Sequence, residues 1–376
     1  PTRAELWEQL DRECYKDCSY MVIPHNSNLS NGFMFEKPNQ DEIYLQNIRE
    51  PLVEIFQHKG SSECALDSLD PLCSFEQLPY KDFRSKFRND FSQAPKSSFA
   101  RDALGEGMLI KNQTNINPFK FGFIGSTDTH LGTPGAVDEE VFQGHGGAGK
   151  SFRESIPDGL PDDIEFNPGG LAVVWSEENS RTAIFNALKR KEVYGTSGPR
   201  FLVRFFLGDN LDEDLCSQST AISSSYKKGV PMGGTLNSND ISKATLFVSA
   251  KADQLMPDQF IEKIQVVKGV LREGQIITSV HDIQSQSSTD LNPETCEVVG
   301  TGVRSMCAVW SDPNFKQGDE AYYYVRVIAN KSCRWSQSLC VQNPEYCKDQ
   351  TEFEVPKFIQ ERAWTSPIWL EKTLDI

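Results

Sequence analysis

The sequence predicts an α/β fold in which helices cover a sheet of short apolar strands, followed by a mostly antiparallel β-rich part. In the first part of the chain, short apolar runs alternate with helical segments, which is typical of a parallel sheet buried on both faces. From about residue 209, β-branched and apolar runs follow one another between turn residues. We expect a β/α barrel over 1–208, a β-rich module over 209–330, and a tail over 331–376 that packs back on either of them.

Each element has its own signal. Thr2 and Glu5 have the spacing of a capping box, which predicts a helix over about 4–14. Small and apolar residues at helical spacing over 183–188, with basic residues at 189–191, predict a second helix. Apolar runs predict strands at 20–23, 52–56, 121–124, 171–175, 245–250, 261–271, 275–281, 303–310 and 321–329, with a hairpin turn at 272–274.

Composition argues against several classes of protein. The 376 residues carry 38 Lys and Arg against 53 Asp and Glu, and the net charge of −15 disfavours a nucleic-acid or anionic membrane partner. The apolar runs are far shorter than the roughly 18 residues of a membrane-spanning helix. The 10 cysteines show no Cys-x-x-Cys zinc pattern. They slightly favour a periplasmic or secreted protein with disulfides near the C-terminus, and scattered buried thiols are the alternative.

The strongest candidate for chemistry is the polar segment after the strand at 121–124. Asp128 and His130 lie two residues apart there, so a carboxylate and an imidazole can face one metal ion. His25 follows another apolar run, is held by Pro24 with its restricted φ, and is a candidate ligand of the same centre. For each of these residues the alternative is an incidental polar side chain in a loop.

Further ionisable residues lie within or after the strand at 52–56. Glu54 is inside the apolar run, where a carboxylate is costly to bury unless it is paired or bound to a metal. It is a candidate ligand or ligand-orienting residue, and a buried salt bridge is the alternative. Glu63 is another candidate ligand, and His58 is a candidate ligand or the proton donor to a leaving group.

Two other motifs suggest anion binding. Residues 144–151 read Gly-His-Gly-Gly-Ala-Gly-Lys-Ser, which matches the phosphate-loop pattern. That loop requires an apolar strand before it and a helix after it, and the flanking sequence predicts neither, so a flexible glycine loop is the better interpretation. Arg200 ends a compact turn, where it could hold a phosphate or sulfate by two hydrogen bonds or pair with a core carboxylate.

Taken together, these motifs resemble a bacterial domain-of-unknown-function family related to the PHP (polymerase and histidinol phosphatase) metal-dependent hydrolases. The segments that carry the resemblance are 23–30, 53–55, 60–63, 125–130, 187–190, 196–200 and 361–369. The resemblance implies the C-terminal part of a distorted PHP-like barrel, two or three divalent ions (Zn, Mn or Fe), and hydrolysis of phosphate or similar anionic esters. It implies that His25, Asp128 and His130 are ligands, and that Glu54 and Glu63 occupy family positions of unsettled role.

The chain departs from the PHP pattern at its beginning. That pattern opens with a His-x-His pair ahead of the histidine that His25 matches, and no histidine precedes His25 here. Because the chain also opens on what reads as a helix in the middle of a protein, we expect the first ligands to lie upstream. Loss of the metal centre is the alternative.

The sequence therefore predicts a metal-dependent hydrolase of a small phosphate or sulfate ester, incomplete in this chain, in which a metal-activated water attacks the ester and Arg200 binds the anion. One alternative is a non-catalytic binding or structural protein with a degenerate barrel. Another is a nucleotide-binding protein that uses residues 144–151. The sequence makes no prediction of the oligomeric state.

Overall fold

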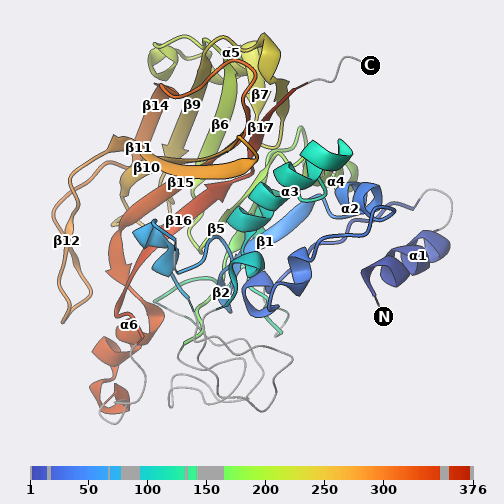
Figure 1. Ribbon diagram of the computed structural model, residues 1–376. Helices are drawn as coiled ribbons and strands as arrows, with labels where there is room; N and C mark the ends of the chain where they lie inside the picture. Colours follow the sequence, from blue (N-terminus) through green and yellow to red (C-terminus); the bar gives the residue numbers. More distant parts are fainter. Residues whose placement is uncertain are drawn as a thin grey trace.

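The protein is described by a computed structural model, which covers residues 2–14, 18–66, 68–77, 94–130, 132, 134–140, 142, 165–347 and 355–372. A long twisted sheet runs through the middle of the molecule, with a second sheet above it and helices with a small sheet beside it (Figure 1). The helices are α1 (Arg3–Glu13), α2 (Ile43–Arg49), α3 (Ala100–Thr114), α4 (Arg181–Lys189), α5 (Ala221–Lys228) and α6 (Trp335–Gln342).

The central sheet has eight strands, and its main path runs β11-β10-β15-β16-β5-β4 with antiparallel pairing throughout. β17 pairs with β15, and β8 is added in parallel to β17. The sheet therefore joins segments from all three parts of the chain. Its strands are β4 (Leu171–Val174), β5 (Val193–Thr196), β8 (Thr235–Asn237), β10 (Ile261–Arg272), β11 (Gln275–Ser285), β15 (Glu320–Cys333), β16 (Phe358–Thr365) and β17 (Ile368–Glu371).

Three smaller sheets complete the architecture. An antiparallel sheet of order β14-β9-β6-β7 lies above the central sheet, and a sheet of order β2-β1-β3 contains the parallel pair β1 and β3 (Figure 1). β12 and β13 form a separate pair. The strands are β1 (Leu52–Gln57), β2 (Gly60–Ser61), β3 (Gly122–Gly125), β6 (Leu202–Asp209), β7 (Gly229–Pro231), β9 (Ala244–Lys251), β12 (Asp290–Leu291), β13 (Val298–Val299) and β14 (Ser305–Ser311).

The central sheet is buried on both faces. Val266 of β10 packs in one core with Phe205 of β6, from the upper sheet. The next residue, Val267, points to the opposite face and packs in a second core with Ile55 of β1 and Leu104 of α3. Side chains alternate along a strand, so β10 contributes to both cores.

The expected β/α barrel is not formed by the described residues, whose strands lie in open, mostly antiparallel sheets. The sequence pattern misled because β4 is as apolar as a short parallel strand, although it pairs antiparallel with β5. The segment 20–23 is also not a strand, although the Val22 N–H bonds to the Arg49 carbonyl at 2.8 Å. The other expected helices and strands are present, and Glu273 and Gly274 have the positive φ that the β10–β11 hairpin turn needs.

Two glycines let β3 cross close to β5. A Cβ added at Gly195 would lie 2.7 Å from the Gly125 nitrogen, and one added at Gly125 would lie 2.7 Å from the Thr196 carbonyl oxygen. Glycine is required at both positions because the two backbones touch where a side chain would otherwise stand. This contact brings the small parallel sheet against the central sheet.

Disulfides fit the expected periplasmic or secreted location, though they are not confined to the C-terminal region. They join Cys14 to Cys18, Cys64 to Cys73, Cys216 to Cys307, and Cys296 to Cys333. None of the described helices combines the length and apolar character needed to cross a bilayer.

The Cys216–Cys307 bridge closes a loop with a sequence separation of 91, whereas Cys14–Cys18 spans 4. We expect the double substitution of Cys216 and Cys307 by Ser to lower the free energy of unfolding by about 4 kcal/mol, and the matched double substitution of Cys14 and Cys18 by about 2 kcal/mol, because the longer loop gains more entropy on unfolding. Urea unfolding of the three proteins measures this, and equal losses would contradict it.

Candidate metal-binding site

The candidate site lies at the carboxyl ends of β1 and β3. The two strands are parallel, with Glu54 opposite Ile124, so the residues that follow them emerge at the same edge. His58 follows β1, and Asp128 and His130 follow β3. Ligand sites in sheets with parallel strands are commonly built at this edge. We call Glu54, His58, Asp128 and His130 the Asp128 cluster.

Backbone contacts hold the segment after β3 in place. The Ser126 N–H bonds to the Phe56 carbonyl at 3.0 Å, and the Gly170 N–H bonds to the Ser126 carbonyl at 2.7 Å. A Cβ at Gly169 would lie 2.7 Å from the Thr127 Cα, so that glycine permits the close approach. Asp128 itself has a left-handed φ of 51°, which Asp tolerates better than most residues. The segment is thus fixed in a turn that presents the Asp128 carboxylate.

The Asp128 carboxylate faces two imidazoles. Its Oδ2 lies 3.8 Å from His58 Nε2, and its Oδ1 lies 3.7 Å from His130 Nε2. The Lys59 ammonium also donates to Oδ2. Burial alone would raise the pKa of Asp128, but the hydrogen bond and charge of Lys59 and the charges of both histidines hold it below its usual range. Asp128 is therefore an anion that faces one ammonium and two imidazoles from two loops.

A contact at the ring nitrogen that does not face Asp128 fixes the orientation of the His58 ring. It is completely buried, and its Nδ1 lies 3.2 Å from the Thr127 carbonyl oxygen. A carbonyl can only accept, so Nδ1 carries the hydrogen and, in the neutral ring, the Nε2 lone pair is turned toward Asp128. This carbonyl–imidazole arrangement is the one that usually orients a metal-bound histidine.

Glu54 brings a second carboxylate to the same edge. Ser126 donates to its Oε1, while its buried Oε2 has no hydrogen bond of normal geometry from the described residues. Burial raises the pKa of Glu54, and the Ser126 hydrogen bond and the charge of His25 offset only part of this effect. A buried carboxylate oxygen without a protein donor is available to bind a cation.

His25 lies at the rim of this edge with its ring exposed. The preceding residue anchors it, because the Pro24 carbonyl accepts from the Glu54 N–H at 3.0 Å. The next residue, Asn26, accepts a hydrogen bond from the Gln57 amide, which also lies 3.3 Å from Asp128 Oδ2. The loop that carries His25 is thereby linked to Asp128. The structure thus places His25, Glu54, His58, Asp128 and His130 around one edge, with His25 and His130 the more exposed members.

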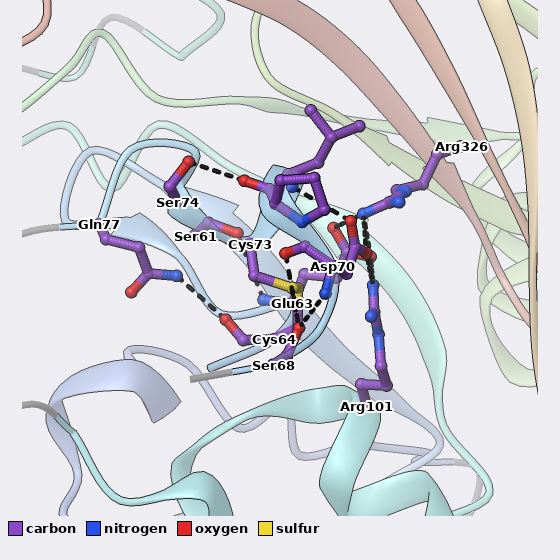
Figure 2. The surroundings of a disulfide bond; sticks show 12 residues. Ser61, Glu63, Cys64, Ser68, Asp70, Cys73, Ser74, Gln77, Arg101 and Arg326 are labelled. Carbon is purple, nitrogen blue, oxygen red and sulfur yellow. Dashed lines mark hydrogen bonds and ion pairs between the residues drawn. A yellow bond between two sulfur atoms is a disulfide. The ribbon is translucent and has the colours of Figure 1, made fainter. Parts of the chain in front are cut away.

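Glu63 is engaged in a different set of contacts, which we call the Glu63 network. Arg101 Nη2 donates to Glu63 Oε1 at 2.6 Å, and Arg326 Nη1 lies 3.2 Å from the same oxygen. Asp70 binds the same two guanidinium groups at 2.9 and 2.8 Å (Figure 2). Tyr324 and Trp364 also donate to Glu63. Its oxygens are thus occupied by protein donors, so the structure assigns Glu63 to packing rather than to the Asp128 cluster.

Asp70 also lies beside two sulfur atoms. Among the described residues, Cys64, Asp70 and Cys73 are a set of three ligand-type side chains whose atoms all lie within 4.8 Å of one another. The two cysteines are joined in a disulfide (Figure 2), so neither offers the thiolate that a metal needs. The Asp128 cluster is more open than this set, because it consists of carboxylate–imidazole pairs around one acid. Its donor atoms are nevertheless of types that bind divalent metals.

Arg200 and the glycine motif do not join the cluster. The Arg200 backbone N–H bonds to Asp253 at 2.7 Å, and within the described residues its guanidinium makes no hydrogen bond or ion pair with the Asp128 cluster. Residues 144–151 lie outside the described residues, so the structure does not test the phosphate-loop interpretation. Sequence reasoning missed Gln57 and Lys59, although both directly flank His58 at the end of an expected strand.

A cleft of about 1350 Å³ opens elsewhere, between α3, the segment 31–37 and the β10–β11 hairpin. It includes none of the Asp128 cluster. Its lining mixes Lys37 and Lys263 with Asp102 and Asp282, so its charge does not select a ligand. We therefore place the candidate chemistry at the Asp128 cluster, where donor types and orientation agree, rather than in this cleft.

Comparison with protein families gives one clear result. The model of the family described as "Protein of unknown function (DUF3604)" matches residues 1–372. The chain belongs to this family. No curated protein and no solved structure matches the chain. The family description assigns no activity, so the resemblance to PHP hydrolases stays a prediction for this DUF3604 chain.

The Glu63 network makes stability depend on acid pH. Burial alone would raise the pKa of Glu63, but Arg326 and Arg101 lower it from 4.5 to about 2. Its carboxylate therefore stabilises the fold fully above about pH 4.5, and this contribution is lost as the pH falls toward 2. We expect Glu63→Gln to cost about 3–5 kcal/mol at neutral pH, since it leaves buried guanidinium charge uncompensated.

The difference in free energy of unfolding between wild type and Glu63→Gln should shrink by about 3 kcal/mol between about pH 5 and pH 2. Denaturant unfolding at several pH values measures it. Glu106→Gln, an exposed carboxylate of α3, is the matched control, with an expected change below about 0.5 kcal/mol. A Glu63→Gln difference that does not vary with pH would refute the assignment.

Proposed function

We propose that this DUF3604 chain binds divalent metal at the Asp128 cluster and hydrolyses small phosphate or sulfate esters there. The observation that supports the proposal best is the arrangement of Asp128 between two imidazoles, with the partner-lacking Glu54 oxygen at the same edge. Carboxylate and imidazole donors suit Zn, Mn and Fe. A divalent ion at such a site polarises the ester and lowers the pKa of a bound water, so that hydroxide is available at neutral pH.

The chain's own residues have separable roles in this proposal. Asp128, His130 and His58 present their donor atoms, and the Thr127 carbonyl keeps the His58 ring in the ligating tautomer. Glu54 supplies an oxygen from inside the strand, and His25 supplies an imidazole at the rim. In the hydrolysis itself, water forms the new bond to phosphorus or sulfur, the ester oxygen leaves, and a proton must reach it. His25, exposed at the rim, can exchange that proton with solvent.

We expect Asp128→Asn and His130→Ala to lower divalent-metal affinity by more than about 10-fold, the smallest effect usual even for residues that only orient ligands. Metal content after dialysis and hydrolysis of p-nitrophenyl phosphate and sulfate with added Zn, Mn or Fe are the measurements. His281→Ala is the matched control, because that ring lies on β11 and contacts Ser279. Full-length wild-type protein that retains no metal and hydrolyses neither ester would refute the hydrolase and favour a binding or structural protein.

Lys59 provides a sharper test, because its ammonium competes with any other cation for Asp128 Oδ2. We expect Lys59→Met to raise metal affinity at the Asp128 cluster by about 10-fold, the change produced by roughly 1.4 kcal/mol. Lys189→Met, on the exposed face of α4, is the control. Titration with Mn²⁺ measures both variants. Weaker binding by Lys59→Met would mean that Lys59 supports the site rather than competing with its ion.

A further inference from the structure

β11 forms one edge of the central sheet, and among the described residues no strand pairs with its outer side (Figure 1). None of its 11 residues is buried, although most of the neighbouring β10 is. The ladder between the two strands is regular from Gln275 to Asp282, and a bulge follows. This regular stretch of exposed edge is longer than a typical whole strand of about 5–6 residues.

The hairpin turn fixes which backbone groups of β11 point outward. Glu273 and Gly274 both have positive φ, which defines a two-residue turn of type I′, whose flanking residues form a hydrogen-bonded pair. Those flanking residues are Arg272 and Gln275. Hydrogen-bonded and non-hydrogen-bonded pairs alternate along an antiparallel ladder, so every second residue from Gln275 bonds to β10. The residues between them point their N–H and C=O groups away from β10, and they are Ile276, Thr278, Val280 and Asp282.

These outward backbone groups are left open. No backbone hydrogen bond from another described segment reaches them. Natural proteins usually blunt a sheet edge with a lysine, a proline or a bulge. The stretch from Gln275 to Asp282 contains no Lys and no Pro, and its bulge comes only afterwards. The side chain of Ile277 is also 51% exposed on this strand. β11 therefore has the features of an edge that another strand covers.

The charge of this edge favours a second copy of the same chain as its occupant. Each chain carries a net charge of −15, so two copies repel one another over most of their surfaces. β11 is nearly neutral, because its ionisable side chains are His281 and Asp282. The Asp282 carboxylate already has partners on β10, with the Lys263 ammonium at 3.7 Å and the Gln265 amide at 2.6 Å. Two acidic molecules can therefore approach one another along this strand.

We propose that two copies of this chain associate through β11, paired antiparallel about a two-fold axis at Ser279. In this register Thr278 lies opposite Val280 of the second copy, and Ile276 lies opposite Asp282. The register uses all of the outward-pointing residues, and each of these pairs can exchange two backbone hydrogen bonds. It also covers Ile277 and places no two like charges opposite one another. The central sheets of the two copies then form one continuous sheet, and no member of the Asp128 cluster takes part.

Sedimentation velocity of the whole chain tests the association. We expect wild type to be a dimer at about 100 μM, well above the dissociation constant of a micromolar complex. Thr278→Pro should raise the dissociation constant at least about 10-fold, because proline removes an outward N–H and leaves the ladder with β10 intact. Thr278→Val keeps that N–H and is the matched control, with an expected change below about 3-fold. Circular dichroism shows whether each variant is folded.

A charge exchange at Ser279 tests the register. Like charges directly opposite one another destabilise a cross-strand pair, so Ser279→Lys and Ser279→Asp should each be monomeric. An equimolar mixture of the two should regain the dimer, because an ammonium then faces a carboxylate, and this recovery also shows that both variants are folded. Ser223→Lys, at an exposed position of α5, is the control and should remain as dimeric as wild type.

Three results would contradict the proposal. Wild type that stays monomeric at about 100 μM would overturn it and leave this edge to an extended peptide of another protein. A dimer that survives Thr278→Pro would place the interface elsewhere on the molecule. A mixture of the two folded Ser279 variants that stays monomeric would overturn the pairing about Ser279.

Discussion

The Glu63 carboxylate is the point where three distant parts of the chain meet inside the protein. Arg101 comes from α3, Arg326 from β15 and Trp364 from β16, and each donates to this one group. With Asp70 included, two carboxylates bind two guanidinium groups, and the buried Arg362 adds a third positive charge nearby. Removal of one of the charged members would leave an uncompensated charge in the core.

This constraint extends to the candidate metal-binding site through the backbone. The Ser62 N–H bonds to the Ile55 carbonyl at 2.8 Å, and the Ser62 hydroxyl accepts from the Asn28 N–H at 3.2 Å. The Asn28 amide donates to the Lys59 carbonyl at 2.9 Å. The loop that carries His25 and the turn that carries His58 are therefore positioned by the same short segment that ends at Glu63. The segment that ends at Glu63 therefore supports both the packed core and the candidate metal-binding site.

The sequence was a good guide to local structure and a poor one to how segments assemble. The capping box at Thr2, the hairpin turn at Glu273 and the pairing of Asp128 with His130 are local patterns, and each is present in the structure. The barrel could not be rejected from the sequence, because the apolar run of β4 reads like a parallel strand although β4 pairs antiparallel with β5 in the structure. Glu63 was unpredictable for a related reason, since its partner Arg326 lies 263 positions away.

The crossing of β3 over β5 gives the protein a mechanical weakness at a well-defined place. Bare backbone touches bare backbone at Gly125 and Gly195, so a methyl group at either position would act as a wedge between two sheets. Ser126 and the turn that carries Asp128 begin one residue after Gly125. A methyl group at the crossing would therefore displace this turn as a whole instead of loosening a single side chain. A substitution at this crossing should therefore misalign the residues at the carboxyl ends of β1 and β3.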